Sequence, residues 1–188
     1  MNMDIGIDFH GVAANPERIT LQRIQEQYGV TLASDQLTSR KATAIFSKYS
    51  EVVVSIEEGL DLFAFEVNPY LKSVCSGFLK AGHGVFLIST LSDKAVKNAM
   101  KFLELHEVMY DAWISSQGVP KDEVMKSMGI DLIVDDDPLV VLTAIESGLD
   151  GLLFDRPCNR DITVPEGRRI FDLREIKRYI QSQHSPIL

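Results

Sequence analysis

Short apolar runs alternate with amphipathic segments along most of the chain. Each run is a few residues long and rich in Val, Ile, Leu and Phe, which indicates a buried β-strand. We predict strands at 3–9, 84–89, 112–115, 131–134, 151–154 and 169–171. Between them, apolar residues recur at the spacing of one helix face. We predict helices at 69–81, from 92 to about 107, and at 122–128, 139–147 and 174–183.

This alternation predicts an α/β fold of Rossmann-like, three-layer type, in which a parallel sheet is covered by helices on both faces. Gly129 and Gly148 each follow a predicted helix, where a left-handed residue commonly ends it. Ligands of such sheets bind at the carboxyl ends of the strands. Asp8, Ser89 and the acidic pair 135–136 lie at these ends, so we expect the chemistry there.

Residues 15–66 interrupt the alternation. Their apolar residues have helical spacing, and no strand is evident among them. These apolar residues are Ile19, Ile24, Tyr28, Ala42, Ile45, Phe46 and Tyr49. We therefore predict a small helical cap at 15–66, inserted after the first strand of a core domain made of 1–14 and 67–188. No repeat or low-complexity linker indicates a second independent domain.

Composition narrows the class of protein. The 188 residues, 45% hydrophobic and 24% charged, suit one globular domain with a small insertion. A net charge of -8 without a basic stripe argues against a nucleic-acid polymer as partner. It does not argue against a small phosphorylated metabolite, which a local lysine or metal ion can bind.

No signal-peptide pattern and no apolar stretch near the ~20 residues that span a bilayer occur. We expect a soluble, cytoplasmic protein that does not bind membranes. The oligomeric state is not indicated by the sequence. Cys75 and Cys158 are far apart and lack a histidine pair, which favours neither a zinc site nor a disulfide framework.

Asp8 ends the first predicted strand and precedes the turn-forming His10-Gly11. A carboxylate at the tip of a buried strand can attack phosphorus and form an acyl phosphate. Taken alone, the same aspartate also fits a cap of the following segment. Asp8 is therefore a candidate nucleophile whose assignment depends on what lies beside it.

Three aspartates, Asp135, Asp136 and Asp137, follow the apolar run 132–134. Clustered carboxylates repel one another unless a cation compensates them, and Mg²⁺ prefers oxygen ligands. A solvated acidic turn is the alternative. Because parallel strands end at the same edge of a sheet, we expect this acidic loop to lie beside Asp8, with Asp135 and Asp136 binding Mg²⁺.

Ser89 ends the strand at 84–89 and can donate a hydrogen bond to a phosphate oxygen. Thr90 is the candidate if the strand register differs by one residue. Lys121 lies just before a predicted helix, where its ammonium could neutralise both Asp8 and the phosphate. Each also fits an ordinary structural or surface role when taken alone.

Taken in order, these features resemble the four motifs of the haloacid dehalogenase (HAD) superfamily. The corresponding segments are 5–12 for motif I, 85–89 for motif II, Lys121 for motif III and 133–136 for motif IV. The match covers most of the chain, and the ordered spacing is more specific than any single motif. The resemblance implies a magnesium-dependent hydrolase with Asp8 as nucleophile.

A narrower resemblance is to the deoxyribonucleotidase-type 5'-nucleotidases. It rests on 81–84, on 129–138 and on 153–160, which are similar to phrases of that family. The family carries a small helical cap after motif I, where 15–66 lies here. The resemblance implies a phosphomonoesterase acting on nucleotides or similar metabolites.

His10 departs from the superfamily pattern, which usually has a second aspartate two residues after the nucleophile. In the family this position binds Mg²⁺ through its backbone carbonyl, so the resemblance implies a metal site made by Asp8, His10, Asp135 and Asp136. The imidazole has an unperturbed pKa of ~6.5 and could act as general acid and base. We hypothesise that it does, with a pH optimum at or below neutrality.

Several alternatives stay open at this point. His10 also fits a HAD-like protein that binds metal and phosphate without fast turnover. A receiver-type phosphoacceptor domain and another HAD reaction, such as carbon–halogen or phosphonate cleavage, fit the order and types of residues less well. Four cap aromatics could stack on a base or simply pack within the cap, which we favour. They are Phe46, Tyr49, Phe63 and Phe65.

The other three histidines lack a metal-ligand partner at short spacing, and we interpret them as structural. They are His83, His106 and His184.

Overall fold

A computed structural model describes residues 2–37, 48–57 and 64–183. Its centre is a parallel six-stranded sheet in the order β5-β4-β1-β6-β7-β8. The strands are β1 (Asp4–Asp8), β4 (Gly84–Ser89), β5 (Ala112–Ser115), β6 (Leu132–Asp135), β7 (Asp150–Phe154) and β8 (Arg169–Ile170). Every predicted strand is confirmed, with ends within one residue of those expected.

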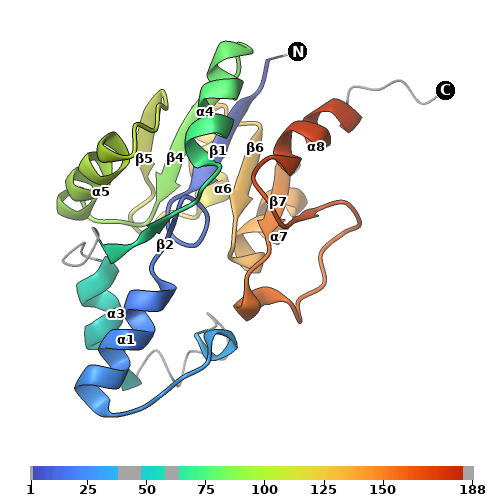
Figure 1. The fold of residues 1–188 in the computed structure, drawn as a ribbon. Coiled ribbons are helices and arrows are strands. Elements are labelled where there is room, and N and C mark those ends of the chain that lie inside the picture. The colour runs from blue at the N-terminus through green and yellow to red at the C-terminus, as the bar shows by residue number, and fades with distance from the viewer. Residues whose placement is uncertain (1, 38–47, 58–63, 184–188) are drawn as a thin grey trace.

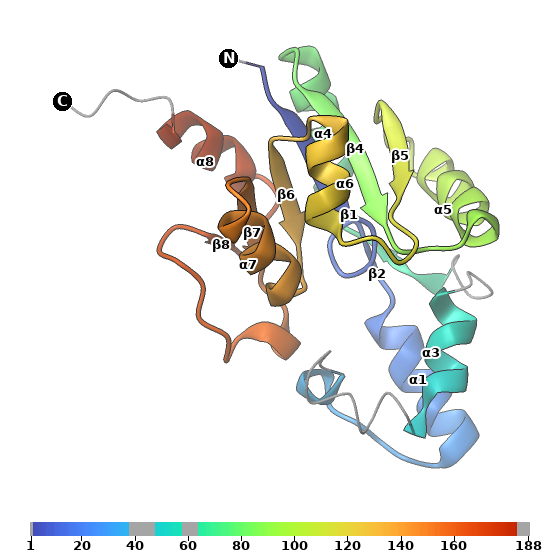
Figure 2. The same ribbon diagram turned by 180° about the vertical axis from the view of Figure 1, so that it is seen from behind.

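Helices cover both faces of the sheet (Figures 1 and 2). One face carries α4 (Leu71–Lys80), α5 (Asp93–Leu105) and α8 (Glu175–Gln183), and the other carries α6 (Lys121–Met128) and α7 (Pro138–Glu146). Two hydrophobic clusters match these layers, and consecutive residues Leu87 and Ile88 of β4 belong to different ones. Because both faces are buried, the strands are continuously apolar.

Helix ends follow the predicted chemistry. Gly129 and Gly148 both have a positive φ, +70° and +80°, directly after α6 and just after α7. Helix α5 begins after Ser92, whose side chain accepts a hydrogen bond from the Ala95 N–H at 3.4 Å. These residues mark where α6 and α7 end and where α5 begins.

The described part of the segment inserted after β1 is mainly helical, as predicted. It contains α1 (Glu17–Tyr28), a 3-10 turn η1 (Ser34–Gln36) and α3 (Ser50–Glu57), and α1 and α3 lie together beyond the carboxyl ends of the strands (Figure 1). Tyr28 and Tyr49 join the two helices, with ring centroids 4.9 Å apart. The predicted helical positions Ala42, Ile45 and Phe46 lie outside the described residues.

The sequence did not indicate the short antiparallel pair formed by β2 (Ala14–Asn15) and β3 (Glu66–Val67). Strands of two residues are too short to show an alternating pattern. The pair brings the two ends of the insertion together. Among the helices that the structure describes, none has the length and apolar character required to cross a membrane.

Candidate active site

The acidic residues of β1 and β6 meet at the carboxyl edge of the sheet. β1 and β6 pair in parallel with Ile7 opposite Val134, so Asp8 and Asp135 follow side by side. Asp8, Asp135 and Asp136 each offer a carboxylate oxygen, and these oxygens lie within 4.8 Å of one another. The structure therefore brings together the two acidic segments that the sequence places more than a hundred residues apart.

Lys121 joins the same cluster. Its Nζ donates to Asp8 Oδ1 at 2.5 Å and to Asp135 Oδ2 at 2.6 Å, and only 9% of its side chain is exposed. It is the first residue of α6, where the sequence pattern placed it just before the helix. Burial alone would lower the pKa of Lys121, but Asp135 and Asp8 outweigh this and raise it above its ordinary value.

Negative charge exceeds positive charge in this cluster. Burial raises the pKa of Asp8 well above its ordinary value; Lys121 lowers it, and Asp135 and Asp136 raise it again. The pKa of Asp136 is raised to about 7, by burial first and then by Asp135, against the lowering effect of Arg156. Three carboxylates beside one ammonium are what a divalent cation with oxygen ligands would complement. The residues present fit such an ion.

The turn after Asp8 is shaped around Asp136. Gly11 has φ of +84°, and a Cβ built there would collide with the Asp136 carboxylate, so only glycine fits. The Gly11 N–H donates to Ala14 O at 2.8 Å, and the Ala14 N–H donates to Phe9 O at 2.8 Å. Neither of these hydrogen bonds uses the His10 carbonyl oxygen, and among the described residues no N–H donates to it. That oxygen is available as a ligand.

The His10 imidazole lies between the core and the inserted segment. Its ring centroid is 5.1 Å from that of Phe9 and 5.7 Å from that of Phe65. Its Nε2 is buried and has no hydrogen-bond partner within the described ranges. Burial, and then the charge of Lys121, lowers the pKa of His10 to about 4. The ring is therefore neutral at pH 7.

Ser89, not Thr90, occupies the buried position at the end of β4. Asp8 on β1 pairs with Ile88 on β4. Ser89, the next residue of β4, therefore lies near Asp8 at the strand ends. Ser89 is 1% exposed, whereas Thr90 lies beyond the strand and is exposed. The Ser89 Oγ accepts a hydrogen bond from the Trp113 Nε1 at 3.1 Å. The strand register therefore places Ser89, and not Thr90, at the buried strand end, and the binding of phosphate by either residue stays a prediction.

Asn159 is a buried residue of the site region that sequence reasoning did not single out. It ends a 3-10 turn, η3 (Pro157–Asn159), and is 1% exposed. Its Nδ2 donates to Asp136 O at 2.8 Å and to Phe154 O at 2.9 Å. Its Oδ1 accepts from the Arg169 Nη1 at 2.9 Å. Asn159 thereby ties the acidic loop to the loop after β7.

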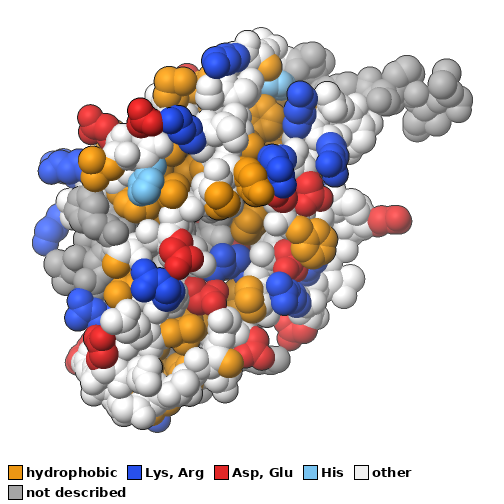
Figure 3. Space-filling view, viewed as in Figure 1, with side chains coloured by type: hydrophobic (Ala, Val, Ile, Leu, Met, Phe, Trp, Pro, Cys, Tyr) orange, Lys and Arg blue, Asp and Glu red, His pale blue; other side chains and the backbone are white. Residues whose placement is uncertain are grey.

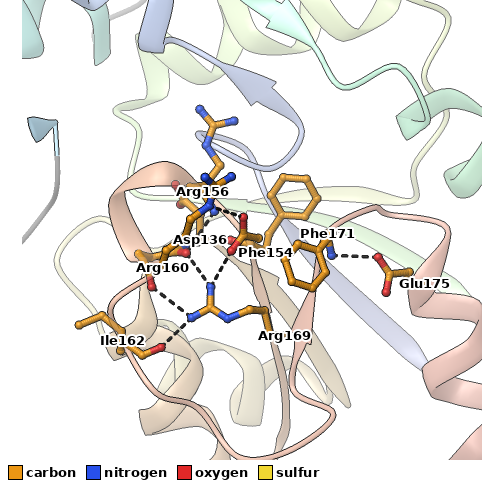
Figure 4. A network of polar contacts seen from close by, with 10 residues as sticks. Asp136, Phe154, Arg156, Arg160, Ile162, Arg169, Phe171 and Glu175 are labelled. Atoms are coloured by element: carbon orange, nitrogen blue, oxygen red, sulfur yellow. Dashed lines mark hydrogen bonds and ion pairs between the residues drawn. The ribbon is translucent and has the colours of Figure 1, made fainter. Parts of the chain in front are cut away.

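Arg156 links this loop to the start of the inserted segment. Its Nη2 donates to Asn15 Oδ1 at 2.5 Å and to Glu17 Oε2 at 2.7 Å. The Arg156 and Glu17 side chains are 14% and 21% exposed. Figure 4 shows the Arg156 side chain extending away from the Arg169 network. Both Arg156 and Asn159 lie in the segment 153–160 that supports the narrower resemblance, but their partners are distant in sequence.

The remaining candidates are placed as follows. Tyr49 is buried against Tyr28 and Phe65 is buried against His10, so both pack within the described part of the structure. His83 accepts a hydrogen bond from the Met3 N–H through Nδ1, and the His106 ring lies tilted against that of Phe102, with centroids 4.6 Å apart. Phe46, Phe63 and His184 lie outside the described residues.

Comparison with known proteins identifies the fold. No family model and no curated protein matches the sequence, but solved structures match the fold. A HAD-superfamily hydrolase of subfamily IA from Geobacter sulfurreducens aligns with a TM-score of 0.61 at 18% identity, over 95% of this chain and 96% of that one. CbbY from Rhodobacter sphaeroides, solved with phosphate, aligns with a TM-score of 0.66 at 12% identity, over 94% and 96%.

A predicted phosphoglycolate phosphatase from Haemophilus somnus aligns with a TM-score of 0.62 at 13% identity, over 96% of this chain and 98% of that one. The chain therefore has the fold of the HAD-superfamily hydrolases, along nearly its whole length. The α/β class and the small insertion after β1, both predicted from the sequence, are confirmed. At these identities the likeness concerns the fold, and the chemistry has to be argued from the site.

Proposed function

We propose that this protein is a magnesium-dependent phosphatase that hydrolyses a small phosphate monoester, with Asp8 as the nucleophile. The observation that carries the proposal is the buried cluster of Asp8, Asp135 and Asp136, joined by Lys121, at the carboxyl edge of a HAD-like sheet. Strand-end carboxylates in this arrangement suit phosphoryl transfer, which depends on positioning and charge compensation.

Asp8, the carbonyl oxygen of His10, Asp135 and Asp136 would hold the cation. When bound, Mg²⁺ would supply positive charge that offsets the repulsion between the carboxylates and an incoming phosphate. It would also favour the ionised form of Asp8, whose pKa is raised in the metal-free protein. The nucleophile would then be ready at neutral pH.

The chain's own residues perform the two steps. An Asp8 oxygen attacks phosphorus in line, the P–O bond to the substrate's alcohol breaks, and an aspartyl phosphate forms. Lys121 and Ser89 hold phosphoryl oxygens. His10 gives a proton to the leaving oxygen and takes one from the water that then hydrolyses the aspartyl phosphate. This role requires a bound phosphate dianion to raise the pKa of the His10 ring from about 4, and we propose an optimum at or below neutral pH.

Relatives of the fold suggest the substrates to test. CbbY, in a mutant form, was solved with xylulose-1,5-bisphosphate, and another neighbour is named as a predicted phosphoglycolate phosphatase. The narrower sequence resemblance adds nucleoside monophosphates, both ribo- and deoxyribo-. We propose that the cap at 15–66 covers the site and selects among such small phosphorylated metabolites.

The surface supports a small-molecule partner rather than a nucleic-acid polymer. The net charge is -8, and Figure 3 shows basic and acidic side chains interspersed over the face with α4, α5 and α8. Binding a polynucleotide draws on several lysines or arginines aligned with its phosphates. A single phosphate needs only the local charges of the site.

A second candidate function follows from His10. A HAD-like protein with an imidazole in place of the second carboxylate could bind Mg²⁺ and phosphate without fast turnover. The pKa of about 4 for this ring favours the neutral form, which is a poor acid before substrate binds. This candidate predicts phosphate binding with no release of product.

A phosphate-release screen separates the two candidates. The panel comprises nucleoside monophosphates, sugar phosphates and phosphoglycolate, each with Mg²⁺ and with EDTA, for the parent and for Asp8→Asn. We expect magnesium-dependent release by the parent on at least one class and none by Asp8→Asn. Release by the variant at the parent rate would contradict Asp8 as nucleophile, and binding without release by the parent would favour the second candidate.

A further inference from the structure

The Ser89 hydroxyl is held by two N–H groups. Its Oγ accepts from the Trp113 Nε1 at 3.1 Å and from the Leu91 backbone N–H at 3.4 Å. A serine hydroxyl has two acceptor positions and one donor position, so both acceptor positions are taken. Within the described ranges, no protein acceptor receives its proton. The hydroxyl is left as a donor only.

A donor without a protein acceptor suits an anion. Ser89 is 1% exposed and directly follows the residue that pairs with Asp8. Buried polar groups usually have their hydrogen bonds made, so an unassigned buried donor calls for a partner. A phosphoryl oxygen is an acceptor only. The hydroxyl's orientation therefore matches the ligand that the proposed function requires.

Trp113 is itself held in place beside the nucleophile. Its ring centroid lies 5.0 Å from that of Phe9 and 6.4 Å from that of Tyr110. Phe9 directly follows Asp8, and its N–H donates to Ile88 O at 3.1 Å. One indole thus packs against the segment that carries the nucleophile while its N–H holds the Ser89 hydroxyl.

We propose that Trp113 is a positioning residue of the phosphate subsite. Its indole N–H occupies an acceptor position of Ser89 and so directs the Ser89 proton toward a phosphoryl oxygen. Indole nitrogen can donate a hydrogen bond but cannot accept one. The Ser89 hydroxyl therefore cannot donate its proton to Trp113, and the proton stays free for another acceptor. The inference rests on the proposed function, because it assigns the partner of Ser89 as phosphate.

Trp113→Phe tests the role because it keeps an aromatic ring and removes the N–H. One neutral hydrogen bond changes an affinity by roughly three- to tenfold. We expect inorganic phosphate, measured by calorimetry with Mg²⁺ present, to bind Trp113→Phe more weakly by that factor. Tyr110→Phe is the matched control, since it removes a polar group from the neighbouring aromatic ring that does not contact Ser89, and should bind phosphate like the parent.

The chain contains a single tryptophan, so its indole N–H gives one peak in a ¹H–¹⁵N spectrum that needs no assignment. In the parent with Mg²⁺, we expect this peak to move as inorganic phosphate saturates the site. In Ser89→Ala without phosphate, we expect it to leave its parent position, because the acceptor has gone. A role confined to core packing would leave the peak insensitive to phosphate.

The outcomes separate two failures. An indole peak that stays in place in Ser89→Ala, or that does not move when phosphate saturates the parent, overturns the positioning role. Parent-like phosphate affinity in a folded Trp113→Phe overturns it as well. If Trp113→Phe does not fold, the two spectra of the parent and of Ser89→Ala still decide. Failure of the proposed function shows elsewhere, as absence of magnesium-dependent phosphate release by the parent.

Discussion

His10 is the residue at which this site departs most from the superfamily it resembles. The position usually carries a second aspartate, and here a carboxylate would join three others around one lysine. The pKa values of Asp8 and Asp136 are already raised by burial and by neighbouring carboxylates. A neutral imidazole adds no negative charge to this cluster. The substitution therefore eases the electrostatics of the metal-free site while keeping a group that can carry a proton.

Replacing His10 tests its role in proton transfer. We expect His10→Ala to lower kcat roughly 100-fold or more, with KM nearly unchanged, because the ring handles a proton rather than holding phosphate. His10→Asp supplies the usual carboxylate and should recover part of the loss. The measurement is steady-state kinetics on the best substrate, with urea unfolding as a check on the fold. If His10→Ala retains the parent kcat, the ring is not the general acid or base.

The raised pKa of Asp136 should make the stability of the metal-free protein depend on pH. This pKa is raised from 3.8 to about 7, so between these values the unfolded chain loses this proton and the folded chain keeps it. The resulting stability is present at acidic pH and is lost as pH rises through about 7. In EDTA, the free energy of unfolding should fall across this window by on the order of 1 kcal/mol per pH unit and then level off.

Urea unfolding at several pH values between 5 and 8 measures this slope. Asp136→Asn removes the titrating group, so its slope should be shallower than that of the parent. Excess Mg²⁺ should also flatten the parent's slope, because ligation favours the carboxylate. Asp137→Asn is the control: Asp137 caps α7 and is the weakest of the named charges acting on the pKa of Asp136, so this variant should stay close to the parent slope. Equal slopes in the parent and in Asp136→Asn would contradict a raised pKa of Asp136 in the folded protein.

The polar residues of the site illustrate what a sequence pattern can predict. Asp8, Ser89 and the acidic pair were found because each follows an apolar strand, and parallel strand ends share one edge. Trp113 and Asn159 were not found. Their importance lies in partners 24 and 23 residues away along the chain. Only the fold shows which distant polar atoms these side chains meet.

At the scale of elements, the central strands were predictable because they are buried on both faces and so are mostly apolar. The cap was predictable as helical from its spacing, but the β2–β3 pair at its base was not, since two-residue strands leave no pattern. This pair, together with the contact of Arg156 with Glu17 and Asn15, connects the inserted segment to the core. The base of the insertion is therefore fixed by polar contacts.

Arg156 should matter for substrate binding through this connection. Arg156→Gln removes the ion pair to Glu17 and loosens the start of α1, so we expect a several-fold rise in KM with a smaller change in kcat. Arg160→Gln is the matched control: Arg160 pairs with Asp155 but its side chain is 65% exposed, and such pairs contribute little. Steady-state kinetics of both variants measures the difference. Equal KM values in both would mean that Arg156 does not hold the cap in its working position.

At the scale of the whole molecule, one sheet edge gathers groups from β1, β4, α6 and β6, which the chain visits in turn. The order of these elements and the fold class were predictable, because strand and helix patterns alternate regularly. The identity of the substrate was not, because under the proposed function it depends on the shape of the cap and on side chains that meet only in the folded chain. The fold supplies the acidic edge, and under the proposed function the inserted segment selects the substrate.

Binding of a divalent cation tests the central claim most directly. We predict that calorimetric titration with Mg²⁺ or Mn²⁺ finds one ion per chain, and that Asp8→Asn, Asp135→Asn and Asp136→Asn each weaken binding by roughly tenfold or more. Asp137→Asn keeps the cap of α7, since asparagine also caps helices, and should bind like the parent. Parent-like binding in all three cluster variants, or no binding by the parent at millimolar concentrations, would contradict the account.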